Sequence, residues 1–289
     1  MDQPLEPILE ALFATEAVQV CPSDSPFWYT SGKFGPYYVN THYLIGGKKA
    51  AEEALARIDA EVSSKTTCPV QLGDLFRQTE LDSPTFRASI ATLVAAARAL
   101  HKKTPFDAIS GGERRDWYFS LRVAEHLGLP HVSVFKDLTA VLSQPGDRSD
   151  ARPLSPDDLR GQRVLHIVDI VTEASSYVRA WIPALAGLGC VFEDTLSVVD
   201  RDQGGESVLA QNRVRLHSLA VIRPELFDGA CRQGWIDSSQ NEMVQRFISD
   251  PDGFMRDFTK RHPDFVRRTL EAGGKNAEKA RLAMEKGYV

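Results

Sequence analysis

The segment that most constrains the fold of this chain runs from Arg163 to Ser176 and reads RVLHIVDIVTEASS. Its first part, 163–168, consists of apolar and β-branched residues apart from Arg163 and His166, which predicts a strand buried in a sheet. Asp169 follows this strand, and open α/β sheets bind ligands beyond the carboxyl ends of their strands. A hydroxyl-rich turn and the start of a helix come next, so free backbone amides would lie beside the turn. This order predicts a site for an anion such as a sugar phosphate.

The hydroxyls of the turn belong to Thr172, Ser175 and Ser176. Glu173 lies among them, so we expect it to place a negative charge in the middle of the anion site. The same residues also fit a plainer interpretation, in which they form a helix N-cap after a buried strand. The sequence leaves both interpretations open.

The composition is that of a soluble globular protein. Of 289 residues, 43% are hydrophobic and 25% are charged, which is ordinary for a folded domain. The formal net charge of -5 is not that of a basic, nucleic-acid-binding protein, so we expect no nucleic-acid partner. The four cysteines are far apart in the sequence, so they predict neither a zinc site nor a disulfide framework. The first residues lack a signal-peptide pattern and no apolar stretch is long enough to span a bilayer, so we expect a cytoplasmic protein without a membrane partner.

Alternating strands and helices predict an α/β fold with a mostly parallel sheet flanked by helices. The expected helices are 5–17, 47–62, 83–102, 116–127 and 175–188, and the expected strands are 106–110, 131–135, 163–168, 190–199 and 214–221.

Three further segments complete the expected organisation. Aromatic and β-branched residues around the turn at 31–36 predict a β-hairpin or β-arm within 27–45. The stretch 137–162 is polar and rich in Pro, Asp and Ser, which predicts a mobile loop. From Pro224 onward the pattern is helical and charged.

Four segments, in order along the chain, resemble those of one enzyme family. They are TSGKFGPYYVN at 30–40, HVSVFK at 131–136, the segment 163–176 and VDRDQGG at 199–205. Segment 163–176 resembles the motif with which the type I phosphoribosyltransferases bind phosphoribosyl diphosphate (PRPP). The other three are similar to the arm, the strand that ends in Arg-Lys and the Asp-Arg-Gln-Glu-Gly segment of the orotate phosphoribosyltransferases. The order and spacing of these pieces hold over roughly residues 1–222.

The resemblance implies a fold, a reaction and partners. It implies a phosphoribosyltransferase-like domain over 1–222 with an N-terminal β-arm or hood, and a helical C-terminal extension over 223–289. The implied reaction transfers phosphoribosyl from PRPP to a nucleobase, orotate by default, and releases pyrophosphate. Mg²⁺ is the implied cofactor, PRPP and a nucleobase or nucleotide are the implied small-molecule substrates, and a homodimer is the implied assembly.

The resemblance also assigns roles to residues. Asp169 would hold the ribose hydroxyls, the turn would hold the 5-phosphate, and Arg114 and Arg115 would lie at the pyrophosphate loop. Arg201 and Tyr38 would face the base, and Lys33 would take the place of the arm lysine. The catalytic candidates are Asp169 and Lys136; the substrate-binding set is Lys33, Tyr38, Arg114, Arg115, Thr172, Glu173, Ala174, Ser175, Ser176 and Arg201; no protein residue is assigned to the metal.

Plainer interpretations of these residues remain open. The arginines at 114, 115 and 201 also fit solvated turns, and Tyr38 also fits a core or interface aromatic residue.

Departures from the family pattern leave two functions open. The first acid of the family motif is Val168 here, the glycines of the phosphate loop are replaced by Glu173 and its neighbours, and the loop after Lys136 lacks the family's Lys-Asp-His-Gly group. A carboxylate about 4 Å from a phosphate oxygen would cost on the order of 4 kcal/mol at an effective dielectric near 20. The arm and the segment at 199–205 favour an active phosphoribosyltransferase. The departures favour a catalytically impaired protein of this fold that binds a nucleotide or sugar phosphate as a sensor or regulator.

Overall fold

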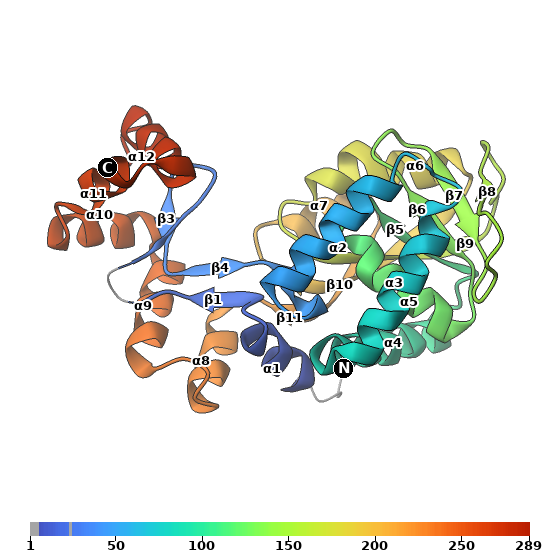
Figure 1. Cartoon of the computed structure of the whole chain (residues 1–289), viewed down its shortest axis with the longest axis horizontal. Coiled ribbons are helices and arrows are strands. Elements are labelled where there is room, and N and C mark those ends of the chain that lie inside the picture. The colour runs from blue at the N-terminus through green and yellow to red at the C-terminus, as the bar shows by residue number, and fades with distance from the viewer. Residues whose placement is uncertain (1–5, 23–24) are drawn as a thin grey trace. The chain divides into compact units, whose positions relative to one another are not determined.

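The computed structural model describes residues 6–22 and 25–289. These residues form two compact units. The first unit contains 41–222 together with the residues up to 17, and the second contains 18–40 and 223–289. Figure 1 labels the elements of both. The second unit therefore includes the β-arm segment, which the sequence analysis assigns to the first domain.

A seven-stranded sheet with the order β11-β10-β9-β5-β6-β7-β8 forms the centre of the first unit. Its strands are β5 (Ala108–Gly112), β6 (His131–Val134), β7 (Ala140–Ser143), β8 (Arg152–Pro153), β9 (Arg163–Val171), β10 (Val191–Asp200) and β11 (Arg215–Val221). The five strands from β11 to β6 are parallel, whereas β7 and β8 are antiparallel to their neighbours. The expected α/β fold with a mostly parallel sheet is confirmed.

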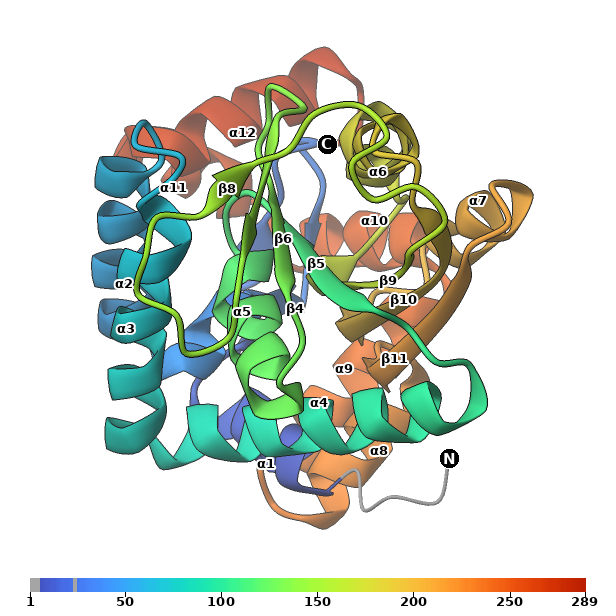
Figure 2. The same ribbon diagram turned by 90° about the vertical axis from the view of Figure 1, so that its right-hand side faces the viewer.

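Helices cover both faces of this sheet. They are α1 (Glu6–Ala14), α2 (Lys48–Glu61), α3 (Cys68–Asp82), α4 (Pro84–Lys103), α5 (Asp116–Leu127), α6 (Ile182–Gly187) and α7 (Gly205–Gln211), with a 3₁₀ turn at Thr41–Ile45 and a π turn at Tyr177–Trp181. Figure 2 shows α5 on one side of the sheet and α6 and α7 on the other. The order in which strands are added to the sheet reverses between β5 and β9. Because crossovers between parallel strands are right-handed, the connecting helices on the two sides of this point lie on opposite faces of the sheet.

Strand β9 is almost completely buried, as its apolar run predicts. It is longer than expected, however, because pairing with β10 continues through Ile170 and Val171. The expectation that the strand ends at Val168 and that Asp169 emerges beyond it is therefore wrong. Asp169 lies within β9, two residues before the end of the strand. It is only 4% exposed.

The segment 137–162, which was expected to be a loop, contains two short strands. Its residues 140–143 form β7, which pairs with β6, and β8 pairs with β7 in turn. The apolar residues Ala140 and Val141 are buried at this edge. The prediction of a loop was wrong for these two short strands.

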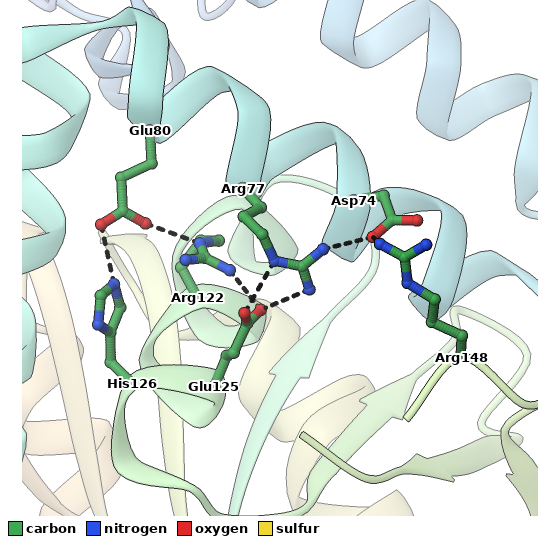
Figure 3. Close-up of polar contacts among 7 residues, drawn as sticks. All are labelled: Asp74, Arg77, Glu80, Arg122, Glu125, His126 and Arg148. Atoms are coloured by element: carbon green, nitrogen blue, oxygen red, sulfur yellow. Dashed lines mark hydrogen bonds and ion pairs between the residues drawn. The ribbon is translucent and has the colours of Figure 1, made fainter. Parts of the chain in front are cut away.

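Helix α3 was not expected, and it packs on α5 through a cluster of charged side chains (Figure 3). Arg122 of α5 is 4% exposed and its Nε lies 2.7 Å from Oε2 of Glu80 of α3. Arg122 also pairs with Glu125, whose Oε1 lies 2.8 Å from Nε of Arg77. Buried charges are tolerated only where they are paired, so this cluster fixes α5 against α3.

The second unit combines two short β-pairs with five helices. Strand β1 (Val18–Val20) pairs with β4 (Tyr37–Val39), and β2 (Phe27–Trp28) pairs with β3 (Phe34–Gly35), all antiparallel. The helices are α8 (Pro224–Arg232), α9 (Ser238–Ser249), α10 (Pro251–Arg261), α11 (Phe265–Ala272) and α12 (Gly274–Glu285). The expected β-hairpin and the expected C-terminal helices are both present.

The core of the second unit joins residues that are far apart in the sequence. Trp28 and Phe34 pack with Phe254, Phe258 and Phe265, and the rings of Trp28 and Phe265 are stacked with centroids 5.3 Å apart. Among the described helices of the chain, none is long and apolar enough to cross a membrane.

Candidate functional site

A cavity of about 220 Å³ lies at the carboxyl end of β9. Its walls are the segment 113–116 before and at the start of α5, the segment 168–171 of β9, residues 172 and 174–176 of the turn that follows, and Tyr177 and Trp181. The strand order of the sheet reverses between the neighbouring strands β5 and β9. Open α/β sheets bind ligands beside the carboxyl ends of the strands at such a reversal. The cavity brings together Arg114, Arg115, Asp169, Thr172, Ala174, Ser175 and Ser176.

Two glycines at the end of β5 allow the wall of the cavity to pack closely. A Cβ atom at Gly112 would lie 2.2 Å from the ring of Trp181, and one at Gly111 would lie 2.1 Å from Oγ of Ser120. Any larger residue would therefore push the turn at 113–115 away from its neighbours. The peptide bond between Glu113 and Arg114 in this turn is cis.

Asp169 is held by groups from two other parts of the first unit, the turn at Thr41 and the start of α5. Thr41 donates a hydrogen bond from Oγ1 to Oδ2 of Asp169 at 2.7 Å, and Nε of Arg115 lies 3.3 Å from the same oxygen. The backbone N–H of Asp169 donates to Oδ1 of Asp116 at 3.0 Å. The carboxylate is thus fixed in one orientation beside the cavity.

Asp116 is a site residue that the sequence reasoning did not select. It is 7% exposed and lines the same cavity as Asp169. Burial and the neighbouring Asp169 charge raise its pKa well above the usual value for an aspartate. The signal in the sequence was weak, because an acid in the first turn of a helix is ordinary.

His42 lies beside these charges and is neutral. Its Nδ1 lies 3.4 Å from a guanidinium nitrogen of Arg115. Burial and then the charge of Arg115 lower the pKa of His42 to about 4. A neutral imidazole adds no further cation to the site at neutral pH.

Two of the expected cations are paired with acids. Nη1 of Arg114 lies 2.6 and 2.5 Å from the two carboxylate oxygens of Asp59. Nζ of Lys136 lies 3.2 Å from Oε1 of Glu113, and the backbone N–H of Lys136 donates to Oε2 of the same residue at 3.1 Å. Glu113 lines the cavity, whereas Lys136 is not among the lining residues.

The hydroxyl-rich turn has a conformation that sequence alone does not reveal. Ala174 has a positive φ of 55° and is buried with its methyl group in the core. Glu173 is exposed and is not among the residues that line the cavity. The expectation that its carboxylate lies in the middle of the anion site is therefore wrong, since the Glu173 side chain is exposed and lies outside the walls of the cavity.

Arg201 and the two arm residues lie outside the walls of the cavity. The backbone N–H of Arg201 donates to the carbonyl of Val171 at 2.9 Å, and its Nε is buried without a hydrogen-bond partner in the described part of the chain. Lys33 and Tyr38 belong to the second unit. There, Nζ of Lys33 lies 2.8 Å from Oδ1 of Asp252, and the ring of Tyr38 lies 6.0 Å from that of Phe27.

Comparison with known proteins identifies the relatives of this chain. No family model matches it. An orotate phosphoribosyltransferase of Rhizobium etli is 29% identical over 146 residues, which are 50% of this chain and 60% of the relative. The orotate phosphoribosyltransferase of a Jannaschia species is 24% identical over 237 residues, which are 81% of this chain and 85% of the relative.

Solved structures share the fold. The UMP synthase of Leishmania donovani has a TM-score of 0.55 at 16% identity and covers 85% of this chain, which corresponds to 42% of that protein. The orotate phosphoribosyltransferase of Francisella tularensis has a TM-score of 0.52 at 12% identity, covering 83% of this chain and 96% of that one.

The chain is similar in sequence to orotate phosphoribosyltransferases and shares the fold of the solved phosphoribosyltransferase structures. Its alignment spans only about three fifths of the Rhizobium relative. Phosphoribosyltransferases typically depend on Mg²⁺, yet among the described residues no group of three or more His, Cys, Asp or Glu side chains is arranged to hold a metal. Mg²⁺ is commonly bound through one or two carboxylates plus the phosphates of a substrate. The donors at this site therefore fit Mg²⁺ only as the companion of a phosphorylated ligand.

Proposed function

We propose that this protein binds PRPP in the cavity and transfers its phosphoribosyl group to a nucleobase, with orotate as the default base. The observation that carries the proposal is the cavity at the carboxyl end of β9. Two buried acids, two arginines and the hydroxyl-rich turn line the same space there. The relatives named orotate phosphoribosyltransferase support orotate as the first base to test.

Each part of PRPP has a complementary group in the cavity. The 5-phosphate would accept hydrogen bonds from the hydroxyls of Thr172, Ser175 and Ser176 and from the amides of the turn. The ribose would lie against Asp169, and the pyrophosphate against Arg114 and Arg115. Mg²⁺, when bound with the substrate, would neutralise negative charge on the leaving pyrophosphate.

The proposed reaction is a displacement at C1 of the ribose. A ring nitrogen of the base forms a bond to C1 and loses its proton to water, while the bond from C1 to the pyrophosphate oxygen breaks and pyrophosphate leaves with the electron pair. Positive charge develops on the ribose while the two bonds exchange, and the fixed Asp169 carboxylate would stabilise it electrostatically.

A homodimer is part of the proposal, and sedimentation velocity of the purified chain tests it.

A second candidate is a protein that binds a nucleotide or sugar phosphate without turnover. The ion pairs of Lys136 with Glu113 and of Arg114 with Asp59 favour it, because both cations are engaged by acids. The short strand β7 favours it as well, since it follows Lys136 where the family pattern has the Lys-Asp-His-Gly group.

A turnover assay separates the two candidates. The protein is incubated with Mg-PRPP and a panel of bases that includes orotate, and released pyrophosphate is measured. The transferase predicts base-dependent release that falls at least about tenfold in Arg115→Gln, which loses a charge-assisted contact. Arg160→Gln is the matched control, because Arg160 is an exposed arginine paired with Asp157 outside the cavity. Binding of Mg-PRPP without any release of pyrophosphate would instead support the sensor.

A further inference from the structure

The second unit contains a pocket of its own, lined by α9 and α10 (Figure 1). Its volume is about 170 Å³, and a cavity of about 150 Å³ is already large enough to hold benzene. Side chains three and four residues apart share one face of a helix, and the lining residues follow this spacing on both helices. They are Ser239, Glu242, Met243 and Arg246 of α9, and Phe254, Phe258 and Arg261 of α10.

The apolar part of this pocket is aromatic. Phe254 and Phe258 are 4% and 1% exposed, and their rings lie within 21° of parallel with centroids 6.2 Å apart. Met243 is half-buried and adds a polarisable thioether from α9. Ring pairs and sulfur–ring contacts stabilise a complex beyond the apolar area that they bury. The apolar lining therefore favours a ligand with an aromatic ring.

The rim of the pocket, formed by its exposed lining residues, includes a cation that no acid engages. A guanidinium nitrogen of Arg246 lies 3.2 Å from Oδ2 of Asp257. Arg261 donates from Nε to the backbone carbonyl of Asp257 at 3.3 Å and makes no ion pair with any residue that the structure describes. An arginine beside an apolar pocket is well suited to bind a carboxylate, through charge-assisted hydrogen bonds.

The rim also limits the charge of the ligand. Glu242 is exposed there as well, and like charges that face each other across a binding site oppose association. One carboxylate can be bound by Arg261, whereas a ligand with several negative charges, such as a nucleotide, would also meet Glu242. A single negative charge fits the rim best.

We propose that the pocket between α9 and α10 binds a small aromatic monocarboxylate. The ring would lie against Phe254 and Phe258, and the carboxylate would accept hydrogen bonds from Arg261. An apolar cavity with a few polar groups at its edge is the usual form of a small-molecule site. This binding activity goes beyond the proposed function and does not depend on it, because all the lining residues belong to the second unit.

Calorimetry of the full chain with benzoate, benzamide and acetate tests the proposal. We expect saturable binding of benzoate with a dissociation constant of about 1 mM or below, as its few non-hydrogen atoms allow. Benzamide keeps the ring but not the charge, and it should bind at least about tenfold more weakly. Acetate keeps the charge without the ring, and it should show no binding at the same concentrations.

Two exposed arginines of α10 provide the test variant and its matched control. Arg261→Gln removes the rim cation and should weaken the binding of benzoate at least about tenfold. Arg256 lies outside the pocket, 3.9 Å from Asp250, so Arg256→Gln should keep the natural affinity. Thermal melting checks that both variants are folded.

Several results would overturn the proposal. Benzoate binding that is lost in Arg115→Gln but kept in Arg261→Gln would place the acid in the cavity at β9. Equal affinities for benzoate and benzamide, or tighter binding of the cation benzylamine, would show that the rim does not select a carboxylate. Absence of saturable benzoate binding up to about 10 mM would show that the pocket is not a site for this class. Pyrophosphate release tests the proposed function separately.

Discussion

At the scale of single residues, two buried histidines make the stability of the first unit depend on pH. His131 is hydrogen-bonded to Ser120 and Ser133, and His166 to Ser110. Burial lowers the pKa of each to about 3, with the charge of His166 as a second cause for His131. Both are therefore neutral in the folded protein over the range in which free histidines titrate.

The sign of the effect follows from the lowered pKa values. Between the folded pKa of about 3 and the unfolded value of about 6.5, the unfolded chain binds more protons. The free energy of unfolding therefore falls as the pH drops below about 6.5, by up to about 1.4 kcal/mol per pH unit for each histidine. In His131→Gln, urea titrations between pH 6 and pH 4 should show this slope reduced by about that amount. An unchanged slope would contradict a buried, neutral His131.

Glu173 gives a second prediction at this scale. Its side chain is exposed and lies outside the walls of the cavity, so water screens its charge from a bound phosphate. At about 10 Å in water two unit charges interact by only about 0.4 kcal/mol. We expect Glu173→Gln to change the affinity for inorganic phosphate by about twofold or less, as measured by calorimetry. A gain of a hundredfold would show that the carboxylate does intrude into the site.

The residues of the turn could be selected from the sequence, but their orientation could not. Thr172, Ser175 and Ser176 follow a strongly apolar strand, and that order alone indicates a site. Ala174, next to Glu173, has a positive φ, a conformation that is uncommon for alanine and that no sequence pattern encodes. Asp116 is recognised only when α5 is seen beside β9.

At the scale of elements, the charged cluster between α3 and α5 stabilises the helix that carries Arg115 and Asp116 (Figure 3). Replacing Arg122 with alanine leaves Glu80 and Glu125 without their buried cation. We expect Arg122→Ala to lower the free energy of unfolding by about 3–5 kcal/mol, the usual effect of breaking a buried pair. Chemical denaturation measures this value.

An exposed arginine with two acidic partners provides the control for this prediction. Arg267 pairs with Asp264 and Glu271 on the surface of α11. Surface pairs contribute little because water and salt screen them, so Arg267→Ala should leave the denaturation midpoint almost unchanged. If both variants behaved alike, burial would not be what makes the Arg122 cluster important.

Elements with a strong periodic pattern were predictable, and those without one were not. Helix α5 was expected at 116–127 and begins and ends there, since Gly128 adopts the left-handed conformation that ends a helix. Helix α3 was missed because Gly73 in its interior weakens its pattern, although Leu72 and Phe76 are buried four residues apart. Strand β7 was missed because its four residues lie in a polar segment.

At the scale of the whole molecule, the second unit joins the arm to the C-terminal helices. Trp28 and Phe34 lie in one core with side chains from α10 and α11. A chain that ends at Ile222 would expose these two aromatic residues, because their core partners are removed. We expect this truncation to aggregate or to bind a hydrophobic dye, as monitored by light scattering and fluorescence. A monodisperse truncated protein with natural thermal stability would contradict the grouping of 18–40 with 223–289.

The most direct test of a PRPP site in the cavity is a calorimetric titration of the full chain with Mg-PRPP, for the natural protein and Arg115→Gln. We predict saturable binding by the natural protein and an affinity at least about tenfold lower for the variant, since it loses a charge-assisted contact to the ligand. Absence of binding at millimolar Mg-PRPP, or equal binding by both proteins, would contradict the assignment of this cavity to PRPP.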